Sequence, residues 1–125
     1  MEKINDLSTP CFILDPKELE RSVRGFQEAL NSKFGNSIVG YSVKTNSVPF
    51  CLKCAGKLGA YAEVVSSDEY ELALACGFSK GNIIYNGPLK SKETFIDAIL
   101  HGAIVNIETK RELSWLKELP HDKKY

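Results

Sequence analysis

The 125-residue sequence has no excess of charge of either sign, because 16 basic residues balance 16 acidic ones. This balance gives no indication of binding to nucleic acid or to a membrane surface. No apolar run reaches the length of a transmembrane helix, and residues 1–6 lack the apolar stretch of a signal peptide. We therefore expect a cytoplasmic protein that has neither a nucleic-acid partner nor a membrane partner.

Histidines and paired cysteines are scarce. The four cysteines include one C-x-x-C pair, Cys51 and Cys54, which has no second pair and no histidine beside it. A zinc site would lack its ligands, so we predict no metal site. Both cysteines fall within an expected helix, where we expect them to pack as small apolar residues. His101, at an expected helix end, and His121, in a polar tail, are not placed for catalysis.

The sequence does contain a repeated unit, a short strand followed by an amphipathic helix, at a spacing of roughly 20 residues. A strand-like run at 11–14 and a helix that begins at Asp15-Pro16 precede the repeats. The expected strands are 38–43, 61–65, 82–85 and 103–107, and the helices after them end near Gly59, Gly77, Gly102 and Pro120. Ser66-x-x-Glu69 and Thr109-x-x-Glu112 are typical of capping boxes at helix starts.

Four consecutive strand–helix units predict an α/β fold with parallel strands and right-handed connections. We expect the first half of an eight-stranded barrel, a fold that takes about 250 residues. A small, open, four-stranded α/β sandwich is the alternative. A half-barrel leaves one strand edge open on each side, so we expect either a truncated chain or self-association through these edges.

Lys44 follows the first repeated strand, a position where partial burial would free its amine as a nucleophile for Schiff-base chemistry. A lysine that simply reaches solvent is the ordinary alternative. The ends of the other strands carry carboxylates, amides and hydroxyls, at Glu63–Ser67, Tyr85–Gly87 and Glu108-Thr109. Such a set, without histidine or a glycine-rich phosphate loop, suits a cofactor whose ring performs the chemistry.

Tyr41-Ser42-Val43-Lys44-Thr45-Asn46 resembles the Tyr-x-x-Lys-x-Asn signature of the fold-type-III, pyridoxal-phosphate-dependent amino-acid decarboxylases, which have an alanine-racemase-like barrel. This is the family of diaminopimelate, ornithine and biosynthetic arginine decarboxylases. The resemblance covers about residues 9–119. Its further matches, in chain order, are Thr9-Pro10 with Phe12–Asp15, Glu63–Ser66 with Glu69, and Ile83–Pro88 with Lys90-Ser91.

The resemblance implies that Lys44 is the catalytic lysine, which forms a Schiff base with pyridoxal 5'-phosphate while an amino acid loses its carboxylate. Diaminopimelate decarboxylase is the nearest likeness. Glu63 and Glu69 are implied as cofactor-binding residues, although Glu69 is equally the third residue of a capping box. Glu63 replaces the aspartate of most relatives and matches the arginine decarboxylase branch, so the substrate class stays open.

Relatives hold the cofactor phosphate and complete the site with a later half of the barrel, a C-terminal β-domain and a partner subunit. The resemblance therefore implies that residues 1–125 are the N-terminal part of the barrel domain of a homodimer, with little or no decarboxylase activity alone. A non-catalytic pyridoxal-phosphate-binding or regulatory protein is the alternative. We expect Asn46 and Asn86 to shape turns, Glu108 to be a helix N-terminal carboxylate, and Trp115 to pack in the last helix.

Overall fold

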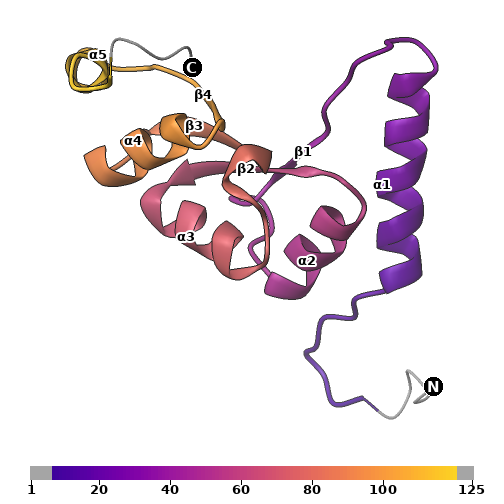
Figure 1. Ribbon diagram of the computed structural model, residues 1–125. Helices are drawn as coiled ribbons and strands as arrows, with labels where there is room; N and C mark the ends of the chain where they lie inside the picture. Colours follow the sequence, from indigo (N-terminus) through magenta and orange to yellow (C-terminus); the bar gives the residue numbers. More distant parts are fainter. Residues whose placement is uncertain (1–6, 121–125) are drawn as a thin grey trace.

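The computed structural model describes residues 7–120, and Figure 1 shows their arrangement. The expectations for residues 1–6 and for His121 lie outside this range. The helices and strands are, in chain order, α1 (Pro16–Asn31), β1 (Gly40–Ser42), α2 (Pro49–Lys57), β2 (Tyr61–Ser66), α3 (Ser67–Ala75), the short 3₁₀ helix η2 (Lys80–Asn82), β3 (Ile83–Leu89), α4 (Lys92–Leu100), β4 (Ile104–Val105) and α5 (Lys110–Leu116).

The four strands form one parallel sheet, in the order β1-β2-β3-β4. Ser42 lies opposite Glu63 in the register of β1 and β2, and Glu63 lies opposite Ile84 of β3. Helix α1 packs against α2 and stands away from the sheet (Figure 1). The parallel strands and alternating helices confirm the predicted α/β fold, and the open sheet is consistent with part of a barrel.

Burial alternates along the two central strands, as expected when one face of a sheet carries the core. Ala62 and Val64 of β2 and Ile83 and Tyr85 of β3 are buried, and they pack with residues of α2, α3 and α4. The residues between them, among them Glu63, are only half-buried. The helices therefore cover one face of the sheet, and the opposite face stays partly open.

The helices begin where the sequence predicts, because their first residues supply the caps. The Asp15 carboxylate accepts the Lys17 backbone N–H at 2.9 Å, and hydroxyls of Ser66, Ser91 and Thr109 cap α3, α4 and α5. Thr109 and Glu112 form the complete capping box that was predicted. The box predicted at Ser66 is only half formed, because the Glu69 carboxylate accepts from Val65 instead of Ser66.

The strands differ more from the prediction. Residues 11–14 form no strand, and Phe12 is fully exposed. The strands predicted at 38–43 and 103–107 shorten to three and two residues in β1 and β4. Strand β3 is instead longer, because a register shift between Val64 and Ser66 lets Ser66 pair with Leu89 beyond the predicted turn.

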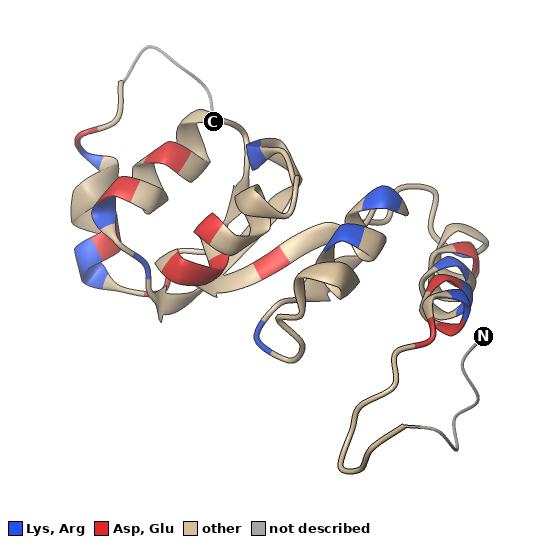
Figure 2. Ribbon diagram, turned by 90° about the horizontal axis from the view of Figure 1, so that it is seen from below, with Lys and Arg blue, Asp and Glu red and all other residues tan. Residues whose placement is uncertain are grey.

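Trp115 packs as predicted, edge-to-face on the Phe95 ring with 5.4 Å between the ring centroids. The amphipathic pattern expected of the last helix is only partly observed, because Leu113 is exposed while Glu112 is fully buried. Basic and acidic side chains are interleaved along α1 (Figure 2), where Arg21 pairs with Glu18 and Arg24 with Glu20. Within residues 7–120, no helix combines the length and the apolar character needed to cross a membrane.

Candidate functional site

The candidate site lies at the carboxyl ends of the strands, and we call Lys44, Glu63, Glu69, Asn86 and Glu108 the strand-end site. In parallel α/β folds this end of the sheet collects the reactive groups, because the loops that leave the strands converge there. The backbone N–H of Val43 donates to the Glu63 carbonyl at 2.9 Å, so the chain that enters the Lys44 turn runs directly beside β2.

Local hydrogen bonds shape the turn that carries Lys44. The Thr45 hydroxyl donates to the Ser42 carbonyl at 2.7 Å, and the Tyr41 hydroxyl donates to the Asn46 carbonyl at 3.0 Å. The Asn46 side chain accepts the Val48 N–H at 3.1 Å, which confirms that Asn46 shapes the turn. Burial, with Cys51 close by, raises the pKa of Tyr41 to about 12, so its hydroxyl remains a proton donor at neutral pH.

Lys44 is exposed, and β1 ends two residues before it. Of the two alternatives for Lys44, a partly buried amine and a lysine that reaches solvent, the structure therefore shows the second. Local turn geometry explains this exposure, because β1 ends at Ser42 and Lys44 lies in the turn that follows it. Among the described residues, Lys44 makes no ion pair with Glu63 or Glu69. The amine is thus accessible to a ligand at this edge of the sheet.

The two predicted carboxylates have different surroundings. Glu63 Oε1 accepts from Asn86 Nδ2 at 2.7 Å, and the Asn86 side-chain oxygen in turn accepts from the Asn106 side chain. Glu69 Oε2 accepts the Val65 N–H at 2.9 Å, while its Oε1 has no partner within residues 7–120. Glu69 therefore leaves one carboxylate oxygen without a hydrogen bond among the described residues. The expectation that Asn86 shapes a turn was wrong, because Asn86 lies within β3. Its side chain instead links Glu63 to Asn106, the residue that follows β4.

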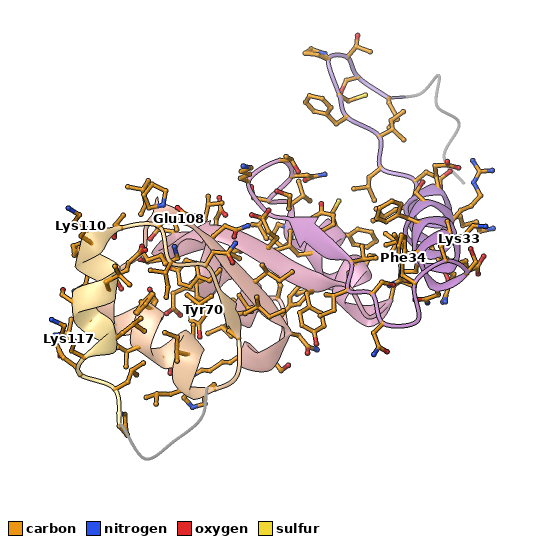
Figure 3. The ribbon with its side chains drawn as sticks, turned by 90° about the horizontal axis from the view of Figure 1, so that it is seen from above. Lys33, Phe34, Tyr70, Glu108, Lys110 and Lys117 are labelled. Carbon is orange, nitrogen blue, oxygen red and sulfur yellow. The ribbon has the colours of Figure 1, made fainter. Side chains whose placement is uncertain are left out.

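Glu108 is not the helix N-terminal carboxylate that the sequence predicted. Its side chain extends from the loop before α5 (Figure 3) to the backbone N–H of Gly87, which donates to Oε1 at 2.8 Å. The sequence pattern does not reveal the buried ion pair of Lys90 and Glu112, in which 3.3 Å separate Lys90 Nζ and Glu112 Oε1. Glu112 had a local signal, the capping box, but the pattern does not reveal that its carboxylate also binds a lysine from the preceding unit.

No group of three or more histidine, cysteine, aspartate or glutamate side chains within residues 7–120 could hold a metal ion. The strand-end site instead offers one accessible amine, carboxylate oxygens and a side-chain amide. An amine can bond to the aldehyde of a carbonyl cofactor, and the carboxylates can accept hydrogen bonds from a ligand. The fold and the site thus define an α/β domain with an open parallel sheet and an accessible lysine amine near the carboxyl ends of its strands.

Comparison with known proteins identifies the family. Residues 17–124 match the family described as pyridoxal-dependent decarboxylase, pyridoxal binding domain. A probable chloroplastic diaminopimelate decarboxylase of Oryza sativa subsp. japonica is 34% identical over 105 residues, 84% of this chain and 21% of that protein. Diaminopimelate decarboxylase of Aquifex aeolicus is 29% identical over 119 residues, 94% of this chain and 27% of that protein.

Solved structures support the same fold. Diaminopimelate decarboxylase from Helicobacter pylori, complexed with L-lysine, aligns with a TM-score of 0.75 at 24% identity, over 91% of this chain and 29% of that one. Lysine/ornithine decarboxylase from Vibrio vulnificus, complexed with putrescine, aligns with a TM-score of 0.70 at 22% identity, over 92% of this chain and 31% of that one.

The chain belongs to the pyridoxal-dependent decarboxylase family and matches its pyridoxal-binding domain, as its motifs predicted. The family identifies the cofactor as pyridoxal phosphate, again as predicted. The chain spans about a quarter of the length of the curated relatives that it matches. The match leaves the roles of Lys44, Glu63 and Glu69 as predictions.

Proposed function

We propose that this chain contributes the lysine-bearing part of a pyridoxal-phosphate-dependent amino-acid decarboxylase and holds the cofactor covalently through Lys44. The observation that carries this proposal is an exposed lysine amine at the carboxyl edge of the sheet, in a domain of a family that binds pyridoxal. An accessible amine is required for attachment to an aldehyde. We propose an amino acid of the diaminopimelate type as the substrate, since the named relatives are diaminopimelate decarboxylases.

The donor set fits the aldehyde end of the cofactor. Lys44 supplies the amine, and the half-buried carboxylates of Glu63 and Glu69 supply oxygens that can accept hydrogen bonds from the ligand. When it is bound, pyridoxal phosphate supplies a ring that accepts the electrons left by a departing carboxylate. The sequence contains no phosphate-type glycine loop at these strand ends, so we expect other residues to hold the phosphate.

The chain's own residues have three tasks in this proposal. Lys44 anchors the cofactor at the strand-end site. Asn86 fixes the orientation of Glu63 through its hydrogen bond to Oε1, which leaves Oε2 of Glu63 to face the ligand. Glu69 keeps Oε2 on the backbone of β2, and its Oε1 would accept a hydrogen bond from the ligand. Because these groups are only part of a complete site, we expect the 125 residues alone to show little or no decarboxylation.

Covalent trapping tests the assignment of Lys44. The purified chain is incubated with pyridoxal phosphate, reduced with borohydride and mapped by peptide mass spectrometry. We expect the label on Lys44, and we expect Lys44→Ala to lose both the label and the visible absorbance of the bound cofactor. Lys33→Ala is the matched control, because Lys33 is exposed just beyond α1, far from Glu108 of the site (Figure 3). Equal labelling of Lys33 and Lys44, or an unchanged spectrum in Lys44→Ala, would refute the assignment.

We also propose that the chain associates with a second copy through its sheet edges. Strands β1 and β4 form the two edges of the described sheet, and Ile104 of β4 is exposed. Unpaired edges offer backbone groups to another strand, and an edge lysine blocks such pairing. Sedimentation velocity should show a dimer that Ile104→Lys converts to monomer. Leu113→Lys, an exposed position on α5, should leave the dimer intact, and equal effects of the two variants would argue against edge pairing.

A further inference from the structure

The most unusual electrostatic feature of the described chain is the buried ion pair of Lys90 and Glu112. Lys90 is 3% exposed and Glu112 is 0% exposed, and Lys90 Nζ lies 3.3 Å from Glu112 Oε1. Transfer of both charges out of water is costly, and hydrophobic residues of similar volume often serve stability as well or better. A pair that is buried so deeply is therefore expected to hold other groups in place.

The pair closes a ring of hydrogen bonds between the end of β3 and the start of α5. Lys90 Nζ donates to the Gly87 carbonyl at 2.5 Å, and the Gly87 N–H donates to Glu108 Oε1 at 2.8 Å. On the other side, Glu112 Oε2 accepts the backbone N–H groups of Glu108 at 2.7 Å and Thr109 at 3.0 Å. The end of β3 and the segment that runs from the loop after β4 into α5 are thus connected twice, and both connections meet at Gly87.

Gly87 adjoins the residue that orients a carboxylate of the strand-end site. Asn86 precedes it and donates from Nδ2 to Glu63 Oε1 at 2.7 Å. Because both the N–H and the C=O of Gly87 are held, the direction in which the Asn86 side chain leaves the backbone is also constrained. The path from the buried pair to the site therefore runs by hydrogen bonds from Glu112 through Lys90 to Gly87. It continues through the covalent backbone to Asn86 and then by the Asn86 hydrogen bond to Glu63.

We propose that Lys90 and Glu112 are positioning residues, which fix the Gly87 peptide and through it the Asn86 amide that orients Glu63. This inference rests on the proposed function insofar as Glu63 faces the cofactor. It assigns the buried pair a role at the site, although neither charged group reaches solvent. A pair with a purely structural role would stabilise the fold but leave Asn86 and Glu63 unchanged whenever the fold is retained.

The test compares three variants. Lys90→Met removes the ammonium and leaves the buried Glu112 carboxylate unpaired, which could prevent folding. The double change Lys90→Met with Glu112→Leu removes both charges, so it serves as the test if the single variant does not fold. Lys80→Met is the matched control, because Lys80 forms an ion pair with Asp97 at 2.7 Å near the opposite end of β3. It removes a cation of the same kind without touching the Gly87 peptide.

The first readout needs no cofactor. NMR should show that amide hydrogen exchange at Gly87 accelerates by about tenfold or more in the single and double variants, which corresponds to loss of local protection. The Asn86 side-chain amide signals should shift in the same variants. Lys80→Met should change neither observable. A folded double variant with unchanged Gly87 exchange and unchanged Asn86 signals would overturn the inference.

The second readout connects the pair to Glu63. We expect the double variant to weaken pyridoxal phosphate binding, measured by visible absorbance, about as much as Glu63→Gln does. In a Glu63→Gln background the same double change should have almost no further effect, because residues on one path are not additive. Full additivity would refute the path. If the unaltered chain does not label at Lys44, the proposed function fails, while the cofactor-free NMR readout still decides this inference.

Discussion

Gly87→Ala should be far more destabilising than an alanine at another glycine of similar backbone conformation. Gly87 has a φ of +78°, and a Cβ built there lies 2.6 Å from the Val65 carbonyl oxygen and 2.8 Å from Val65 Cβ. The left-handed backbone alone costs a residue with a side chain about 1–2 kcal/mol. Displacing β2 to make room adds about 1–3 kcal/mol, as in overpacked cores. The expected loss is therefore about 2–5 kcal/mol.

Gly59 provides the control, because its φ of +83° is similar but a Cβ there meets no atom within 4 Å. Gly59→Ala should cost only the conformational part, about 1–2 kcal/mol. Urea denaturation followed by circular dichroism measures both losses, with the slope of the transition as a check on two-state unfolding. Equal losses in the two variants would refute the argument from the close approach of β2 and β3. The total free energy of unfolding of a domain of this size is about 5–15 kcal/mol, so Gly87→Ala should measurably lower the urea concentration at the unfolding midpoint.

Three further changes probe the interior. Burial alone would raise the pKa of Glu112, but hydrogen bonds from Glu108, Thr109 and Lys90 hold it below its ordinary value of 4.5. The free energy of unfolding should therefore fall as the pH drops below about 4.5, because the native carboxylate must then be protonated. In Glu112→Gln the urea midpoint should depend less on pH over this range, and an unchanged pH dependence would contradict the prediction. Tyr70→Phe removes a 2.8 Å hydrogen bond to Asp97 and should lower the free energy of unfolding, measured in urea, by about 1.5 kcal/mol. An unchanged free energy of unfolding would contradict this prediction. Phe95→Ala should cost about 3–5 kcal/mol and red-shift the fluorescence of the single tryptophan, which it contacts; an unshifted spectrum would refute that packing.

The sequence predicts those parts of the fold that depend on neighbouring residues. Asp15, Ser66, Ser91 and Thr109 mark helix starts because a cap requires only a side-chain oxygen and the next few backbone N–H groups. The spacing of strands and helices then determines a parallel sheet, since consecutive strand–helix units have few other topologies.

The remaining features depend on contacts between distant parts of the chain. Nothing local distinguishes Lys90 from the exposed lysines, because its burial requires Glu112, 22 residues later. Glu108 likewise has the sequence position of a helix N-terminal carboxylate. Only the pairing of β3 with β4 places its side chain beside Gly87. The length of β3 follows from its pairing with Ser66, which the sequence pattern of β3 alone does not contain. Lys44 was located correctly at a strand end, but its exposure depends on where β1 stops.

The order of the strands in the sheet is the order of the strands in the chain, so each strand pairs only with its neighbours in sequence. Such an arrangement resembles a short repeat array, in which each unit is stabilised by the next and the end units have one neighbour instead of two. The two-residue β4 and three-residue β1 have the fewest backbone bonds to break, whereas β2 and β3 share the longest contact and the buried core. Unfolding should therefore begin at both ends of the sheet and proceed inward, and β2 and β3 should be the last strands to separate.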